Sequence, residues 1–362
     1  SGAYTSGGTA ARVYEITTPY MEQDIEYLQF AQSTDTMYIV HRNYAPRKLV
    51  RAGHASWTIN TYSRTADPFT STTKTITGVT QANPGVVTSA AHGLSNGALI
   101  TISGIVGMTQ LNGKFYIVQN VTTNTFTLTD RNGTAIDTTG YTAYSSGGSA
   151  DILDKYPRAV TFTDAARILM AGTLANPTTV WGSKAPSTTT TQFDDFTTGT
   201  AATDAIIFTL APVQGKVDVI QAMANTNKFI TMLTYGTVRR LFGATEQEAI
   251  SPTSINAKAV NAYGAAQILP IANGDVFFYV QRGNRVIRSL EYDISIDGYT
   301  TIDRNLVSEN ITKGQLRQLT EQQGAPDLIW ANMYNGKLLS LTYKQKEDIS
   351  GWASHYLGGS HV

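Results

Sequence analysis

The stretch VFFYVQRGNRVIRSLEY at residues 276–292 decides the fold of this chain. An apolar run rich in aromatic and β-branched residues leads into a short turn with Gly and Asn, and a second such run follows. This order is typical of a β-hairpin, because Gly and Asn let two twisted strands reverse within a few positions. Four more units of this kind occur: MYIVHRNYAPRKLVR (37–51), RILMAGTLANPTTVWGS (167–183), FITMLTYGTVRRLFG (229–243) and LIWANMYNGKLLSLTY (328–343).

The spacing of these five hairpins predicts a β-propeller. From Ile168 to Ile230 is 62 residues, from there to Val276 is 46, and on to Leu328 is 52. A period of about 40–50 residues made of short strands is typical of propeller blades. The first interval, from Tyr38 to Ile168, is 130 residues. We therefore expect an all-β propeller with five recognisable blades and a segment inserted after the first.

The inserted segment, residues 75–150, differs from the rest of the chain in its amino-acid composition and residue pattern. It is nearly free of charged residues, and apolar side chains alternate in ALITISGI (98–105) and TFTLTD (125–130), as half-buried strands require. Three of the chain's five Asn-Gly pairs, each a signal for a tight turn, fall within it. The pattern predicts a small separate β-barrel, with the propeller divided between residues 1–74 and 151–362.

Composition narrows the functional classes. Lys+Arg and Asp+Glu both number 27, so no net charge draws the chain to polyanions or to anionic membranes. Cysteine is absent, which excludes disulfides, thiolate nucleophiles and zinc sites that use Cys. No apolar run approaches the ~20 residues that span a bilayer. We expect no membrane anchor, no cofactor and no bound metal.

One motif has the form of a catalytic nucleophile. Gly93-Leu94-Ser95-Asn96-Gly97 fits G-x-S-x-G, and His92 stands beside it. A nucleophile elbow needs a buried strand before the serine and a helix after it. Here a strand pattern, ALITI, follows instead, so we interpret the motif as a hairpin turn.

Acidic and histidine residues do not form a recognisable active site either. The segment Ser295–Thr300 faintly resembles the Asp-box turn of sialidase propellers, but an Asp-Gly turn between blades is the simpler interpretation. Nothing places Asp194-Asp195, Asp293 or Asp297 opposite one another across a cleft, as a glycosidase requires. The five histidines lack the spacing of a zinc site. We expect that the protein is not an enzyme.

Basic residues gather in and beside three of the hairpin turns. They are Arg42, Arg47, Lys48 and Arg51; Arg239 and Arg240; and Arg282, Arg285 and Arg288. If these side chains line a channel or a subunit surface, they could contact DNA phosphates or an acidic neighbouring subunit. Alternatively, they are outward-facing strand residues in water. The sequence leaves both interpretations open.

Several blocks, in the same order, resemble the tail nozzle (tail tubular protein B) family of short-tailed bacteriophages. They are YEITTPYMEQDIEYLQFAQSTDTMYIVHRNYAPRKLVR (14–51), YPRAVTFTDAARILMAGTLANPTTVWGSKA (156–185) with FDDF (193–196), NLVSENITKG (305–314) and PDLIWANMYNGKLLSLTYKQKEDISGWASHYLGG (326–359). The blocks cover most of the chain outside the insertion. Each is a loose pattern, and their shared order makes the resemblance more specific than any one block.

The resemblance implies a structural virion protein. The family has a six-bladed propeller, so we expect a further blade beyond Val362. By the same resemblance, six copies would form a ring at the distal end of the tail, beside adaptor or tail-tube proteins, and genomic DNA would pass through without specific binding. The protein would be made in the bacterial cytoplasm and reside in the tail. The competing class is a carbohydrate-binding or carbohydrate-active propeller that recognises host surface glycans.

The inserted segment resembles a small barrel found in phage tail proteins and named after the first catalytic-cysteine half-domain of ubiquitin-activating enzymes. The matching residues are Ala91-His92-Gly93-Leu94, Gly97, Leu111-Asn112-Gly113 and Thr125-Phe126-Thr127-Leu128. The name implies no ubiquitin chemistry here, because the chain has no cysteine.

Overall fold

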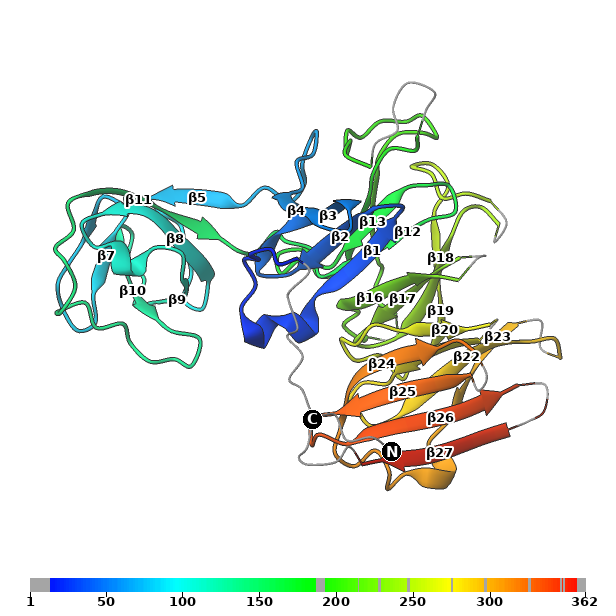
Figure 1. Ribbon diagram of the computed structural model, residues 1–362. Coiled ribbons are helices and arrows are strands. Elements are labelled where there is room, and N and C mark those ends of the chain that lie inside the picture. The colour runs from blue at the N-terminus through cyan, green and yellow to red at the C-terminus, as the bar shows by residue number, and fades with distance from the viewer. Residues whose placement is uncertain are drawn as a thin grey trace.

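The computed structural model describes most of the chain and consists almost entirely of strands (Figure 1). The described residues are 14–186, 193–213, 215–226, 229–245, 248–274, 276–295, 298–324, 327–345, 347 and 349–356. The helical elements among them are three short 3₁₀ helices: η1 (Glu22–Tyr27), η2 (Thr109–Leu111) and η3 (Leu306–Ser308).

Five four-stranded antiparallel sheets form the blades, and in each the strands pair in chain order. Blade 1 contains β1 (Gln29–Ser33), β2 (Thr36–His41), β3 (Tyr44–Gly53) and β4 (Ser56–Thr61). Blade 2 contains β12 (Ala159–Phe162), β13 (Ile168–Ala171), β14 (Thr179–Gly182) and β15 (Ile206–Thr209). Blade 3 contains β16 (Ile220–Asn225), β17 (Ile230–Thr234), β18 (Val238–Phe242) and β19 (Asn256–Asn261). Blade 4 contains β20 (Ile271–Asn273), β21 (Val276–Val280), β22 (Ile287–Asp293) and β23 (Gly298–Asp303), and blade 5 contains β24 (Leu316–Gln322), β25 (Leu328–Met333), β26 (Leu338–Lys344) and β27 (Ile349–His355).

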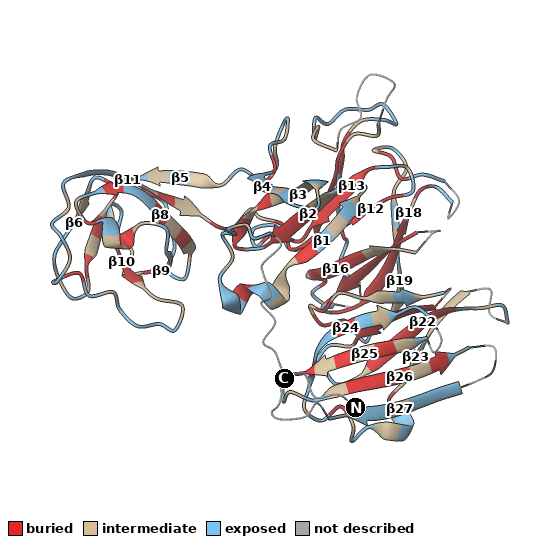
Figure 2. Cartoon of the chain, viewed as in Figure 1, coloured by how far each residue is buried: buried red, intermediate tan, exposed pale blue. Residues whose placement is uncertain are grey.

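The predicted five-bladed propeller arrangement is confirmed. Each of the five hairpins identified in the sequence forms the two central strands of a blade. These central strands are the most buried, as Figure 2 shows, and in β21 all five residues are buried. Outer strands are more exposed: in β27 no residue is buried. The apolar runs were therefore the strongest signal because they lie where neighbouring blades cover both faces of a sheet.

Apolar side chains join consecutive blades. Tyr38 and Val40 of blade 1 pack with Val160 and Met170 of blade 2. Comparable clusters, listed by one residue from each blade, join blades 2 and 3 (Leu169 and Met232), blades 3 and 4 (Leu233 and Phe277), and blades 4 and 5 (Phe278 and Leu341). Aromatic and β-branched side chains meeting between sheets supply most of the stabilisation in such a stack.

Blade 5 meets the start of blade 1 through polar groups. Arg317 of β24 donates to the Glu26 carboxylate of η1 at 2.8 Å, and both charges are partly exposed to solvent. The Tyr27 phenol lies beside Glu26 and Tyr334. The hydrogen bond with Glu26, the burial of Tyr27 itself and the proximity of Tyr334 all raise the pKa of Tyr27 well above its usual value. The apolar clusters of the described residues do not extend across this junction. The further blade implied by the family resemblance remains a prediction.

Residues 72–152 form a separate seven-stranded sheet beside blade 1 (Figure 1). Its strands are β5 (Thr72–Thr75), β6 (Gly78–Val79), β7 (Val86–Thr88), β8 (Leu99–Val106), β9 (Phe115–Gln119), β10 (Thr125–Thr129) and β11 (Ser146–Ile152). They pair in the order β5-β11-β8-β9-β10-β7-β6 around an apolar core that includes Ile100, Leu111 and Phe126. β5 and β6 stand at the two ends of this order, so closure into a barrel remains a prediction.

The place of the insertion follows from strand alternation. In a four-stranded antiparallel blade, the turn between the second and third strands lies on the same face as the connection to the next blade. The inserted sheet lies in the connection from β4 to β12. It therefore faces the β2–β3 turn of blade 1 and the β13–β14 turn of blade 2.

Candidate functional site at the junction of blade 1 and the inserted sheet

A cavity of about 450 Å³ lies where the inserted sheet meets the propeller. Its walls come from η1, from the β2–β3 turn, from the β13–β14 turn and from the inserted sheet. The lining residues are Gln23, Asp24, Tyr27, His41, Arg42, Asn43, Gly97, Leu99, Ile117, Arg131, Leu153 and Leu174. Polar and charged groups from the propeller thus face an apolar wall formed in part by the inserted sheet.

Asp24 is the centre of this site. The residue is 4% exposed, and its carboxylate accepts hydrogen bonds from two parts of the molecule. Arg131 of the inserted sheet donates through Nη1 to Oδ1 at 2.9 Å and to Oδ2 at 3.1 Å. The hydroxyl of Tyr44, on β3, donates to Oδ2 at 2.7 Å. Hydrogen bonds between charged groups are the stronger kind, so this contact ties the inserted sheet to blade 1.

Aromatic rings surround the ion pair. The Arg131 guanidinium lies 4.7 Å from the centre of the Phe115 ring, and Phe115 meets Tyr44 edge-on at 5.1 Å. Tyr20 in turn packs edge-on against Tyr44 at 5.0 Å. The cation over a ring and the edge-to-face pairs each add a modest stabilisation to this contact.

The electrostatics of the site keep Asp24 charged and His41 neutral. Burial would raise the pKa of Asp24, but hydrogen bonds from Arg131 and Tyr44 and the nearby cationic groups outweigh burial and lower it. Burial lowers the pKa of His41 to about 4, against the attraction of Asp24 and with a contribution from Arg42. His41 Nδ1 accepts the Asn43 N–H at 3.1 Å, and its Nε2 lies 3.8 Å from Asp24, beyond hydrogen-bonding distance.

The polar contacts of this site join the inserted sheet to the propeller. Asp24 already accepts three hydrogen bonds, two from an arginine and one from a tyrosine hydroxyl, and neutral His41 is buried beside it. A second carboxylate is not among the lining residues. Among the described residues, no group of three or more His, Asp or Glu side chains is placed to hold a metal ion.

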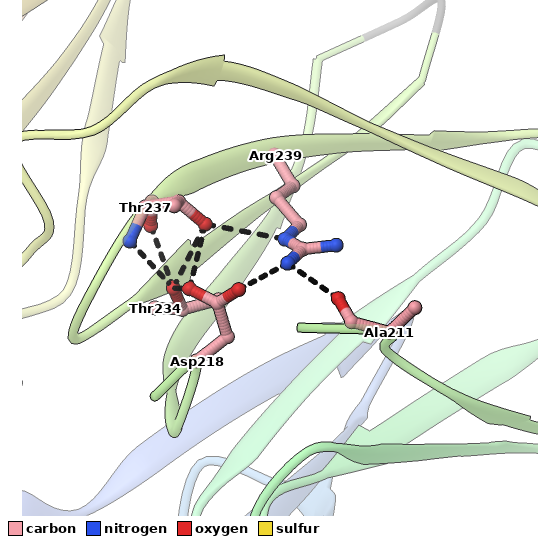
Figure 3. Close-up of polar contacts among 5 residues, drawn as sticks. All are labelled: Ala211, Asp218, Thr234, Thr237 and Arg239. Atoms are coloured by element: carbon pink, nitrogen blue, oxygen red, sulfur yellow. Dashed lines mark hydrogen bonds and ion pairs between the residues drawn. The ribbon is translucent and has the colours of Figure 1, made fainter. Parts of the chain in front are cut away.

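Three of the nine predicted basic contact residues are buried within the blades. Arg239 is 2% exposed, and its guanidinium pairs with Asp218 and donates to the Ala211 carbonyl at 2.7 Å (Figure 3). Arg240 lies over the Tyr299 ring at 4.7 Å. Arg288 stacks on Tyr263 and donates to Gln281. The solvent exposure that both sequence interpretations assumed is wrong for Arg239, Arg240 and Arg288.

The other six basic residues lie at the surface or partly exposed. Arg42 is exposed at the edge of the cavity, and Arg282 and Arg285 are exposed in the β21–β22 turn. Arg47 is partly exposed. The remaining two are partly exposed and paired: Lys48 with Asp194 at 2.8 Å, and Arg51 with Asp35 at 3.1 Å.

The motif with the form of a nucleophile elbow is a turn. Gly93–Gly97 connects β7 to β8, and His92 Nδ1 accepts the Leu94 N–H at 3.0 Å, so the ring holds the turn. Ser95 is exposed and its carbonyl accepts the Ala98 N–H. Of the acidic candidates, Asp293 accepts hydrogen bonds from Ser295, its neighbour two residues on, while Asp194 and Asp195 pair with lysines. Asp297 and His361 lie outside the described residues.

Sequence reasoning missed Asp24 and Arg131, the pair that joins the two parts of the molecule. They are 107 residues apart, and neither belongs to a motif. One signal was available. Arg131 is one of the few charges in the inserted segment and sits in a tight turn beside Asn132-Gly133, where a charge is well presented to a partner.

Comparison with functionally characterised proteins gives no match to this chain. Among solved structures, one similar chain is PorZ, described as an essential bacterial surface component of the type-IX secretion system of Porphyromonas gingivalis. The two share 10% sequence identity and a TM-score of 0.35, over 92% of this chain and 38% of that one. The chain thus spans well under half of the length of PorZ, and similarity at this level does not extend to function. The family described as the ubiquitin-activating enzyme E1 FCCH domain matches residues 82–151, so the inserted sheet is similar to that domain.

Proposed function

We propose that the protein is a structural component of the tail of a short-tailed bacteriophage, where copies form a ring at the distal tube and genomic DNA passes during ejection. The observation that carries this proposal is the combination of a five-bladed propeller with an FCCH-like domain after its first blade. The propeller sequence blocks that resemble the tail nozzle family run in order around this insertion. A propeller gives a rigid unit for a ring, and the insertion gives it a lateral projection.

The chemistry of the described residues agrees with a scaffold. The motif that resembled a nucleophile elbow is a turn held by His92. Of the carboxylates considered for glycoside hydrolysis, Asp194 and Asp195 pair with lysines and Asp293 accepts hydrogen bonds from Ser295. The exposed arginines of the β2–β3 and β21–β22 turns, Arg42, Arg282 and Arg285, lie on one face of the propeller by strand alternation. In a ring they are the cations that would meet an acidic neighbouring subunit or passing phosphates.

The test measures assembly and activity of the full-length protein together. We expect light scattering and electron microscopy to show a closed ring, six copies by the family resemblance, with duplex DNA bound weakly and in a strongly salt-dependent way. Chromogenic glycosides and esters should not be turned over. A stable full-length monomer, or turnover that Ser95→Ala or Asp297→Ala abolishes, would favour the carbohydrate-active propeller instead.

A further inference from the structure

The inserted sheet is attached to the propeller in two places. One is the base, where β11 pairs with both β5 and β8, and where the Asp154 carbonyl just after β11 accepts the Ala175 N–H of the β13–β14 turn at 2.8 Å. The other is the contact of Arg131 and Phe115 with Asp24 and Tyr44. The base is a narrow attachment, because the chain crosses it only just before β5 and just after β11, and by itself it would let the domain change its angle. The orientation seen in Figure 1 therefore depends on the second contact.

We propose that the Asp24–Arg131 ion pair is a latch: it holds the inserted domain against blade 1, and its release frees the domain to swing about its base. This assigns the junction a conformational role that is independent of whether the protein forms a tail ring. The latch comprises Asp24 and Tyr44 on the propeller and Phe115 and Arg131 on the inserted domain.

Local hydrogen bonds order the latch residues on both the inserted domain and the propeller. On the inserted domain, the Asp130 carboxylate accepts the N–H groups of Asn132 at 2.9 Å and Thr134 at 2.8 Å, and this fixes the turn that carries Arg131. On the propeller, the Tyr44 hydroxyl donates to Asp24 and accepts the Met21 N–H at 3.1 Å. Pre-ordered partners lose little entropy when they meet, which favours the closed state.

Two features weaken the closed state. The cavity of about 450 Å³ beside the ion pair means that the two parts are not packed tightly there. Arg131 Nη2 is buried with no hydrogen-bond partner among the described residues, so docking leaves one donor unsatisfied. A contact of four side chains beside a cavity can open as a unit, and the separate apolar cores of the two parts stay intact when it opens.

The groups around Asp24 set the conditions for closure. Arg131 faces it from the inserted domain, Tyr44 and His41 face it from blade 1, and Arg42 and Arg158 lie near His41. The lowered pKa of Asp24 keeps its carboxylate charged at neutral pH, and His41 stays neutral, so the latch is closed under neutral conditions.

Distance measurements between two spin labels test the latch directly. The chain has no cysteine, so Ala55→Cys in the β3–β4 turn and Thr123→Cys in the inserted domain give two unique exposed labelling sites. With the latch intact, pulsed electron paramagnetic resonance should give one narrow distance peak at neutral pH. Arg131→Gln should replace that peak with a broad distribution, and Arg131→Lys, which keeps the charge, should recover part of it.

Lys114→Gln is the matched control, because Lys114 is an exposed cation of the same domain and does not line the cavity. It should leave the narrow peak unchanged. Circular dichroism and thermal unfolding of each variant confirm that the inserted sheet stays folded. A narrow peak retained in Arg131→Gln, or a broad distribution already present with the latch intact, would overturn the proposal whatever the assembly state.

Discussion

At Arg239 a full positive charge lies where water does not reach it. The Asp218 carboxylate balances that charge and also accepts hydrogen bonds from the hydroxyls of Thr234 and Thr237, each at 2.7 Å (Figure 3). Arg239 also donates to Ala211, in the connection from blade 2 to blade 3. A buried pair of this kind fixes a connection in place, and removing one partner leaves the other charge buried alone.

Arg239→Met should therefore destabilise the protein by roughly 3–5 kcal/mol, the range for breaking a buried ion pair. The matched control is Arg317→Met, because Arg317 pairs with Glu26 at the surface and its side chain is 47% exposed. A surface pair contributes about 0–1 kcal/mol. Urea unfolding followed by tryptophan fluorescence measures both, and equal losses in the two variants would contradict the structural role of Arg239.

His41 gives a prediction about pH. Its pKa in the folded protein is about 4, below the ordinary 6.5 that it has in the unfolded chain. Between these values the unfolded chain binds a proton that the folded protein does not, so the stability falls as pH drops from about 6.5 to about 4. His41→Gln should remove this part of the pH dependence. Urea unfolding at pH 7, 5.5 and 4.5 measures it, and parallel curves for the two proteins would show that His41 is not responsible.

At the scale of elements, the hairpin turns decide the register of each blade. The β25–β26 turn contains Asn335-Gly336, a pair that often forms a type I′ turn, but it does not form one here. Of the two residues only Gly336 has a positive φ, +76°, and its N–H donates to the Met333 carbonyl at 3.1 Å. The loop is therefore a type I turn followed by a glycine bulge, a form that also matches the twist of the strands.

Gly336→Val should destabilise the protein by about 1–3 kcal/mol, because a β-branched side chain is strained at positive φ. Gly336→Asn serves as the control, since Asn tolerates this backbone region much better. Thermal unfolding monitored by circular dichroism compares the three proteins. A melting temperature of the valine variant equal to that of the unchanged protein would show that the turn does not hold the register.

At the scale of the whole molecule, the inserted domain and the propeller have separate apolar cores. The core of residues 72–152 is built from its own strands, including Ile102 and Val118, and the blade clusters contain none of them. Thr75 and Ser149 are directly paired at the base of the insertion. Two ends so close can be joined by a short turn with little loss of entropy.

Deletion of residues 76–148, with a short glycine turn joining Thr75 to Ser149, should leave a soluble, β-rich propeller. Asp24→Asn belongs in the same variant, because Asp24 would otherwise lose the arginine that balances its buried charge. Residues 72–152 expressed alone should also fold. Circular dichroism and calorimetry test both pieces. Loss of cooperative unfolding in the deletion variant would mean that the propeller depends on the insertion.

The sequence by itself determined the local architecture. Hairpins such as 276–292 and 229–243 carry strand residues on both sides of a turn within 17 positions or fewer, so their pairing needs no information from elsewhere in the chain. The repetition of these hairpins predicted the blades. The change in charge content and apolar pattern after residue 75 predicted a separate unit. All of these signals come from residues close together in the sequence, where the residue type directly restricts the backbone conformation.

The tertiary structure alone decided which side chains are covered and which meet. In a two-layer protein every second residue of a strand faces water. In a propeller, neighbouring blades cover both faces of a blade. Arg239 and Arg240 are therefore both buried, although they are adjacent in β18 and point to opposite faces. Asp24 and Arg131 meet because the connection from β4 to β12 returns the inserted sheet to the face that carries the β2–β3 turn. Contacts of this kind depend on how whole sheets pack, and no local pattern of residues encodes that packing.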